Sequence, residues 1–176
     1  MTIEDAVRRA TALDEVLLTR ISDLALEAPH KVLSSIRAYL IRRADEMCVE
    51  NNPWASLKFT TASKGVWLIA IGPTIDDGDT PDHFHFDSGA RLSFGLTLQD
   101  YGNGSRLVSF RYQYNLPNGK SPSFLRFDLN RALREKPLTE PLCHLHPGLE
   151  EVRLPLFLHH PLEILDRIFF VVDRNL

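Results

Sequence analysis

The sequence predicts an α+β protein in which an antiparallel meander sheet carries an N-terminal helical hairpin and a C-terminal helix packed on one face. Three observations lead to this prediction. Apolar residues recur at helical spacing over residues 1–50, they alternate with period two in three segments between residues 91 and 130, and they return to helical spacing at the end of the chain. A chain of 176 residues fits one domain, 1–176, and can bury enough surface to fold without a disulfide or a metal.

The N-terminal hairpin is expected to consist of helices over residues 3–28 and about 30–48, separated by Pro29. Thr2 can cap the first helix, with Asp5 three residues later in an acidic variant of the capping box. The apolar positions of the first helix are Ile3, Val7, Ala10, Leu13, Leu17, Ile21 and Leu24, and those of the second are Val32, Leu33, Ile36, Leu40 and Met47.

The sheet prediction depends most on three segments, "RLSFGLTLQD", "RLVSFRYQYN" and "SFLRFDLN", which alternate with period two around the turns "YGNGS" and "PNGK". Two further strands, "SLKFTT" and "GVWLIAIG", precede them. A three-residue loop, 102–104, predicts the pairs Phe94–Tyr112, Leu96–Phe110 and Leu98–Val108. A two-residue turn, 118–119, predicts the pairs Tyr112–Leu125, Phe110–Phe127 and Val108–Leu129. Both hairpins then place their apolar side chains on one common face.

The other face of this meander is expected to be polar, with Arg111 directly opposite Arg126 and Asp128 in the neighbouring row. Two arginines in that position repel each other by a few tenths of a kcal/mol, so a negative group should lie between them. Asp128 can supply that charge, and so can a bound anion such as phosphate. The sequence leaves both alternatives open.

Residues 140–176 are expected to form a histidine-containing loop, "LCHLHPG", a short strand, "EVRLPL", and a terminal helix, "HPLEILDRIFFVVDR". Pro161 suits the first turn of that helix, and His159 and His160 are placed to help cap it. The expected buried stripe is Leu162, Leu165, Ile168, Phe169 and Val172.

Composition narrows the functional classes. A net charge of -3 argues against broad nonspecific attraction to nucleic acid or anionic membranes. Cys48 and Cys143 are far apart and form no CxxC pair, which favours free thiols in a reducing compartment. The N-terminal residues lack the apolar run of a secretory signal, and no stretch approaches 18 apolar residues, so we expect a cytoplasmic protein without a membrane partner.

The stretch "DHFHFD", residues 82–87, is the first candidate for metal binding. In an extended strand, His83, His85 and Asp87 share one face, while Phe84 and Phe86 share the other. The span from residue 83 to residue 87 is about 13 Å, too long for one ion, so a divalent metal would need a ligand from elsewhere. His144 and His146 of the later segment are the obvious donors. The same pattern is typical of a strand that shows one polar face to water.

His85-Phe86-Asp87 resembles the His-x-Asp motif of non-haem iron, 2-oxoglutarate-dependent oxygenases. The resemblance implies that a distal histidine, His144 or His146, completes the metal site and that Arg153 binds the co-substrate carboxylate. The sequence departs from that family at Pro155, where a serine is usual. Two consecutive hairpins also predict a meander rather than the double-stranded β-helix of those enzymes.

The last 70 residues or so, "RYQYNLPNGK…FLRFDLN…HLHPG…PLEILDRI", resemble the small TumE-type toxins of bacterial toxin–antitoxin pairs in order and residue type. The resemblance implies a polar cluster of Arg126, Asp128, His144 and His146 as the catalytic residues, an RNA or nucleotide substrate, and an antitoxin as protein partner. The N-terminal helices and residues 57–100 exceed what such a toxin is expected to contain.

The chemistry of this cluster can be stated from the residue types. A histidine can transfer a proton near neutral pH, and Arg111 and Arg126 could bind the charge of a phosphoryl group. Three functional hypotheses follow: a toxin-like protein acting on RNA or a nucleotide through the Arg/His cluster, a metal-dependent enzyme using His85, Asp87 and a distal histidine, and a non-catalytic partner-binding protein.

Overall fold

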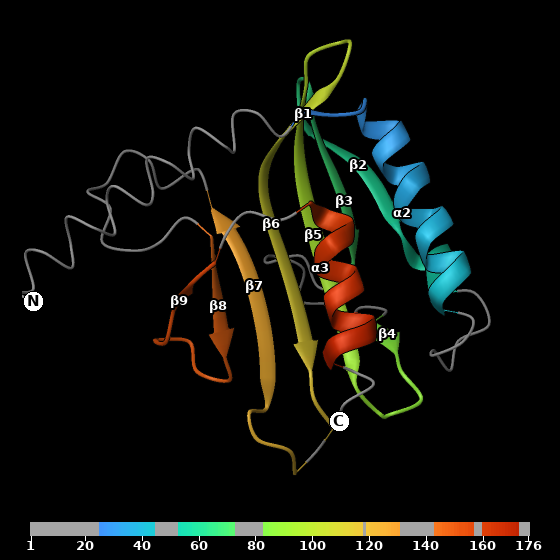
Figure 1. The fold of residues 1–176 in the computed structure, drawn as a ribbon. Coiled ribbons are helices and arrows are strands. Elements are labelled where there is room, and N and C mark those ends of the chain that lie inside the picture. Colours follow the sequence, from blue (N-terminus) through green and yellow to red (C-terminus); the bar gives the residue numbers. More distant parts are fainter. Residues whose placement is uncertain are drawn as a thin grey trace, which may run out of the picture.

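The computed structural model describes residues 25–44, 53–72, 83–117, 119–130, 143–156 and 160–172. Within these residues, nine strands form one antiparallel sheet in the order β2-β3-β5-β6-β7-β8-β9, with β1 paired to β6 and β4 paired to β5 (Figure 1). The strands are β1 (Ala25–Leu26), β2 (Lys58–Ser63), β3 (Val66–Ile71), β4 (Phe84–His85), β5 (Arg91–Asp100), β6 (Ser105–Asn115), β7 (Phe124–Asn130), β8 (Cys143–Pro147) and β9 (Leu154–Pro155). An antiparallel sheet accompanied by helices confirms the α+β class.

In the described parts of the chain, four helical segments accompany the sheet. They are α2 (Pro29–Ala44), the short 3-10 helix η1 (Pro53–Ser56), α3 (Pro161–Asp166) and its π-helical continuation η3 (Arg167–Val172). The second helix of the predicted hairpin is therefore present as α2. Most of the first helix, residues 3–28, lies outside the described residues.

The prediction that the first helix continues to residue 28 is wrong, because Ala25 and Leu26 form the strand β1. They pair with Arg106 and Ser105 of β6, and the Ser105 hydroxyl donates to the carbonyl oxygen of Glu27 at 2.6 Å. β7 pairs with β6 only from Ser109 onward, so this edge of β6 is free to accept β1. Backbone pairing with a distant strand has overridden the local helical pattern.

The predicted pairs between β5 and β6 are correct in the middle of the hairpin and wrong near its turn. Phe94 lies opposite Tyr112 and Leu96 opposite Phe110, whereas Leu98 lies opposite Leu107 instead of Val108. A β-bulge between Thr97 and Leu98 causes the difference, because β6 contributes one extra residue there.

The predicted register between β6 and β7 is wrong by two residues. Tyr112 lies opposite Phe127, Phe110 opposite Leu129 and Tyr114 opposite Leu125. The turn itself is where the sequence predicts it, since the Lys120 amide donates to the Pro117 carbonyl. Residues 121–122 then separate this turn from the strand, and pairing resumes with the hydrogen bond from Leu116 N to Ser123 O. Pro122 has no N–H and cannot extend the ladder, which explains the two extra residues.

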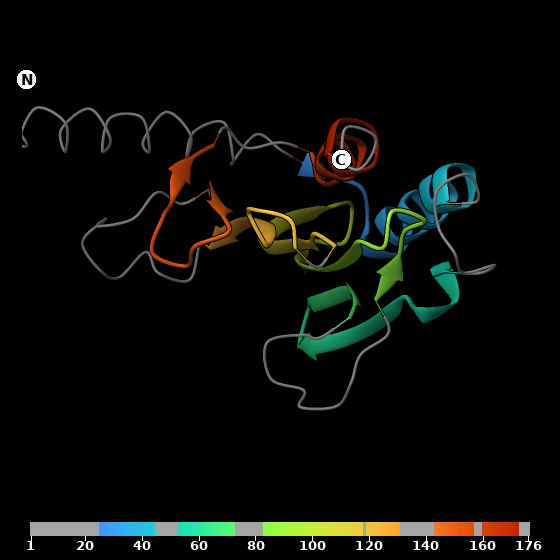
Figure 2. The ribbon, with the colours of Figure 1, turned by 90° about the horizontal axis from the view of Figure 1, so that it is seen from below.

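Because the shift is an even number of residues, the apolar face stays apolar. Buried side chains of β3, β5, β6, β7 and β8 form one core with residues of α2, α3 and η3. Both helices lie on the same side of the sheet in the views of Figures 1 and 2. Tyr39 of α2 packs edge-on against Phe169 of η3 with ring centroids 6.0 Å apart, and the Tyr112 hydroxyl donates to the Pro161 carbonyl at 3.2 Å.

The terminal helix begins as predicted. His160 is its N-cap and accepts a hydrogen bond from the Leu162 amide through Nδ1, while Glu163 completes a capping box and Pro161 occupies the first turn. Leu165, Ile168 and Phe169 are buried as expected, and so is Ile164, which the predicted stripe omits. His159 and the side chain of Val172 lie outside the described residues.

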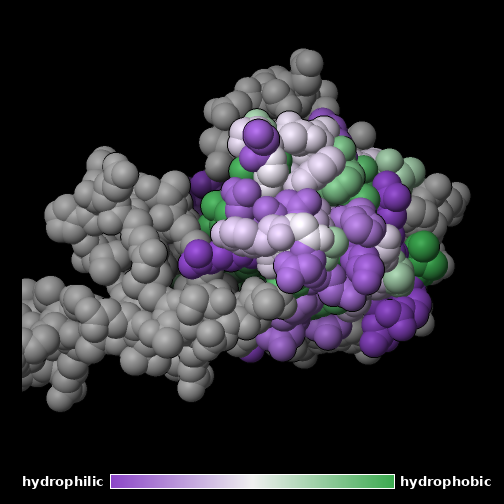
Figure 3. Space-filling model, turned by 90° about the horizontal axis from the view of Figure 1, so that it is seen from above, coloured by the Kyte–Doolittle hydropathy of each residue, from purple (hydrophilic) through white to green (hydrophobic). Residues whose placement is uncertain are grey.

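At the end of the molecule that carries the β5–β6 hairpin, hydrophilic side chains predominate and hydrophobic ones are scattered among them (Figure 3). Among the described segments, no helix combines the length and the hydrophobicity needed to cross a bilayer.

Candidate functional site

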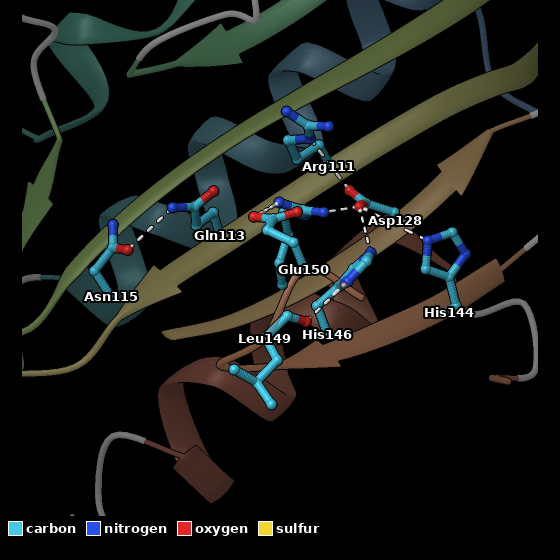
Figure 4. Close-up of polar contacts among 9 residues, drawn as sticks. Arg111, Gln113, Asn115, Asp128, His144, His146, Leu149 and Glu150 are labelled. Atoms are coloured by element: carbon cyan, nitrogen blue, oxygen red, sulfur yellow. Dashed lines mark hydrogen bonds and ion pairs between the residues drawn. The ribbon is translucent and has the colours of Figure 1, made fainter. Parts of the chain in front are cut away.

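The polar face of β6, β7 and β8 brings together the charged residues that the sequence singles out. In one row, Arg111, Asp128 and His144 lie opposite one another, and in the next row Gln113, Arg126 and His146 do so. The predicted pairing of Arg111 with Arg126 is therefore wrong, because the two-residue shift places Asp128 opposite Arg111 instead. We call Arg111, Arg126, Asp128, His144, His146 and Glu150 the Asp128 cluster (Figure 4).

Asp128 is the centre of this cluster, and each of its carboxylate oxygens contacts an arginine. Arg126 Nε donates to Oδ2 at 2.7 Å, and Arg111 Nε donates to Oδ1 at 3.3 Å. The carboxylate thus provides the negative charge expected between the two arginines. The Arg126 pair is almost fully buried, with side-chain exposures of 9% for Arg126 and 10% for Asp128.

Both histidines direct Nε2 towards the same carboxylate oxygen. Nε2 of His146 lies 3.4 Å from Asp128 Oδ2 and Nε2 of His144 lies 3.9 Å from it, and the two ring centroids are 4.8 Å apart. Strand geometry explains this convergence, since residues 144 and 146 share a face of β8. The sequence predicts a loop for this segment, and that prediction is wrong, because Cys143–Pro147 form the strand β8.

The ring of His146 is oriented by a backbone group. Its Nδ1 lies 3.3 Å from the carbonyl oxygen of Leu149 and its Nε2 lies 3.4 Å from Asp128 Oδ2, so each ring nitrogen faces an oxygen that accepts hydrogen bonds. A neutral imidazole can donate to only one of these two oxygens at a time. This arrangement suits a proton or a metal ion between Nε2 and the carboxylate.

Glu150 joins the cluster from the loop after β8. Its Oε1 lies 2.5 Å from Arg126 Nη1, and this hydrogen bond lowers the pKa of Glu150. Burial opposes the charged form of Arg126, but hydrogen bonds and attraction from Glu150 and Asp128 outweigh it and raise the pKa of the guanidinium. With neutral histidines, the two arginines balance the two carboxylates.

Access to the cluster depends on its two exposed members. The side chains of His144 and His146 are 8% and 1% exposed, whereas Arg111 is 41% and Glu150 61% exposed. A ligand that reaches Arg126 must therefore approach along Arg111 or displace Glu150.

Asp128, His144 and His146 could hold a metal ion, because their ligand atoms all lie within 4.8 Å of one another and all three residues are buried. Two imidazoles and one carboxylate suit zinc or iron. The neighbouring guanidinium opposes this, since Arg126 donates to the same Oδ2 atom. At about 4 Å, a unit positive charge and a divalent ion repel by roughly 8 kcal/mol at an effective dielectric constant of about 20. The guanidinium therefore weakens the binding of a divalent cation at this oxygen.

The metal site predicted at His83, His85 and Asp87 takes no ligand from the later histidines. β4 lies on the edge of β5 away from β6, so four strand spacings, roughly 19 Å, separate it from β8. Phe84 and Phe86 are buried while His85 and Asp87 are exposed, as in a strand with one face towards water. His83 and His85 contact each other with ring centroids 6.5 Å apart. Asp87 lies in the turn after β4 and not on the strand.

The same separation bears on the oxygenase-like site, in which His85 and Asp87 would share a metal with His144 or His146. The structure does not bring these residues together. It instead forms a different group of two histidines and one aspartate on β7 and β8, which is the group that could hold a metal among the described residues.

Cys143 is not a candidate nucleophile. It is a buried thiol at the start of β8 and forms no disulfide, and burial followed by the charge of Asp128 raises its pKa to about 12. Cys48 lies outside the described residues.

Sequence reasoning missed Glu150 and the carbonyl of Leu149. The one local signal is Gly148, which directly follows β8 with φ +81° and lets the chain turn back over His146. A turn was predictable from "HPG", but its direction depends on packing against Pro122.

Comparison of the chain with protein-family models, curated proteins and solved structures found no match.

Proposed function

We propose that the protein acts on a phosphodiester or phosphate group of RNA or of a nucleotide, and that the Asp128 cluster carries out this chemistry without a metal ion. The observation that carries the proposal is the convergence of a buried arginine and two imidazole Nε2 atoms on one carboxylate. The TumE-like order of these residues along the chain agrees with it. A toxin-like role would follow, with an antitoxin as partner.

In this mechanism, Arg111 and Arg126 bind the non-bridging oxygens of the phosphoryl group. Guanidinium groups suit that task because they offer several donors in a planar fork and stay charged. Asp128 holds both guanidinium groups in place and orients the imidazoles. One imidazole accepts the proton of the attacking hydroxyl as the O–P bond forms, and the other donates a proton to the leaving oxygen as the second P–O bond breaks.

The proposal is tested with a labelled single-stranded RNA and the purified protein. We expect the unmodified protein to cleave it in the presence of EDTA, and His144→Ala and Arg126→Gln each to lower the rate by about 100-fold or more. His85→Ala is the matched control, since it removes an exposed histidine from the other His-x-His pair. If the unmodified protein fails to cleave the RNA, and if its expression in bacteria also fails to arrest growth, the proposal is contradicted.

A metal-dependent enzyme is the second candidate, and the observation that favours it is the buried Asp128, His144, His146 group. It predicts near-stoichiometric zinc or iron in the purified protein, loss of the metal in His144→Ala and His146→Ala, and loss of activity with EDTA. Elemental analysis of these proteins and of His85→Ala decides between the two candidates. If the protein instead binds a partner without catalysis, a pull-down should recover a stable complex with that partner. The complex should persist in His144→Ala, His146→Ala and His85→Ala.

A further inference from the structure

The polar face of the sheet extends beyond the Asp128 cluster along β6. Arg111, Gln113 and Asn115 follow one another on this face, as Figure 4 shows. Gln113 lies directly opposite Arg126, and its Nε2 donates to Asn115 Oδ1 at 3.0 Å. Both side chains are partly exposed. Two carboxamides are therefore held together beside the two arginines.

An aromatic ring borders these carboxamides. Phe124 is the first residue of β7, lies opposite Asn115 and shares its face. It is partly exposed, and its ring centroid lies 6.0 Å from Cζ of Arg126. The neighbourhood thus combines a ring, two carboxamides and a guanidinium within adjacent positions of two strands.

These groups are the kind that bind a nucleobase. An aromatic ring stacks on the flat face of any base, and a carboxamide offers both a donor and an acceptor to the base edge. Same-face neighbours on a strand are about 7 Å apart, a separation that one sugar ring can bridge between a base and its phosphate. A phosphate on Arg111 and Arg126 would therefore bring its base to Gln113, Asn115 and Phe124.

We propose that Gln113, Asn115 and Phe124 form a nucleobase subsite, and that the ligand of the whole face is one nucleotide unit, free or within single-stranded RNA. The base stacks on Phe124 and exchanges hydrogen bonds with the two carboxamides, which release each other to do so. This inference rests on the proposed function, since it takes the arginines as the phosphate site.

Calorimetric titration of the unmodified protein with inorganic phosphate and with each of the four nucleoside monophosphates tests the subsite. We expect at least one nucleotide to bind about ten-fold more tightly than phosphate. Phe124→Leu and Gln113→Ala should remove that advantage and leave the affinity for inorganic phosphate unchanged. Phe124→Tyr keeps the ring and should keep the advantage.

Ser109→Ala is the matched control, because Ser109 lies on the same face of β6 on the other side of Arg111. It should change neither affinity. Thermal melting of each variant identifies a loss of fold, and Phe124→Tyr keeps the test valid if Phe124→Leu unfolds. Equal binding of phosphate and all four nucleotides, or a nucleotide advantage that survives both Phe124→Leu and Gln113→Ala, overturns the subsite. Failure of both phosphate and nucleotides to bind overturns the proposed function itself.

Discussion

The buried guanidinium of Arg126 and the exposed carboxylate of Glu150 form an ion pair at the solvent-facing side of the Asp128 cluster. The side chain of Arg126 is 9% exposed and that of Glu150 is 61% exposed. Glu150 thus occupies a position on Arg126 that an oxygen of a bound phosphate would need. Because Glu150 is exposed, its own contribution to stability is screened by water.

We therefore expect Glu150→Gln to bind inorganic phosphate several-fold more tightly than the unmodified protein. The substitution keeps the size of the side chain and removes the competing charge. Glu151→Gln is the control, because this neighbouring exposed carboxylate contributes a similar long-range charge. Weaker phosphate binding in Glu150→Gln would mean that Glu150 holds Arg126 in its binding position rather than competing with the ligand.

The same ion pair predicts a pH dependence. The pKa of Glu150 in the folded protein is lowered by Arg126 from its ordinary value of 4.5. A lowered pKa stabilises the fold, so this contribution is complete above pH 4.5 and is lost as the pH falls through the folded-state value. NMR titration of the Glu150 carboxyl should show its pKa returning towards the ordinary range in Arg126→Gln. An unchanged titration would exclude Arg126 as the cause.

Asp128→Asn should lower the free energy of unfolding by about 3 kcal/mol, because it leaves the buried Arg126 without its buried counter-charge. Glu150 still pairs with Arg126 in this variant, and loss of the pair with the partly exposed Arg111 contributes little to the change in stability. The expected loss is therefore at the low end of the range for a broken buried ion pair. Urea denaturation measures the difference. Asp87→Asn, in an exposed turn, should stay within about 0.5 kcal/mol of the unmodified protein. Equal effects of the two substitutions would contradict the structure of the cluster.

Gly148 positions the loop that carries Leu149 and Glu150, and it tolerates no side chain. Its φ is +81°, and a Cβ atom there would lie 2.5 Å from Cβ of Pro122. Gly102 has a similar φ of +86° but has no atom within 4 Å of such a Cβ. Gly148→Ala should therefore lower the free energy of unfolding by about 2 kcal/mol more than Gly102→Ala does. Similar values for the two variants in urea denaturation would show that the contact with Pro122 is absent.

The polar face shared by Arg111, Arg126 and Asp128 was predictable from alternation alone, although the predicted pairs were not correct. Arg126 and Asp128 share one face of their strand in any register, and Arg111 stays on that face when the register shifts by two residues. The pairing of Arg111 with Asp128 was not predictable, because it depends on how residues 121 and 122 leave the turn. The bulge near Thr97 and the pairing of β1 with β6 were missed for a related reason, since both satisfy backbone groups of distant segments.

The different surroundings of the two histidine pairs were likewise not predictable from the sequence. Both pairs have the spacing His-x-His. Periodicity alone therefore cannot tell whether His83–His85 or His144–His146 supplies ligands or catalytic groups. Only the order of strands separates them, because β4 ends beside β5 while β8 lies against β7 and its Asp128. Burial then distinguishes the pairs, with His85 exposed and His146 buried.

The sequence by itself determined which side chains share a face, because the two-residue period of a strand and the spacing of a helix are local properties of the chain. It thereby determined the antiparallel sheet, α2, the start of α3 and the polar face that holds Arg111, Arg126 and Asp128. The tertiary structure decided which residues on that face touch: Asp128 between the arginines, both histidines on one oxygen, and Glu150 over Arg126. Those contacts join segments far apart in the chain, and their distances depend on loop length and strand order, which no local pattern encodes.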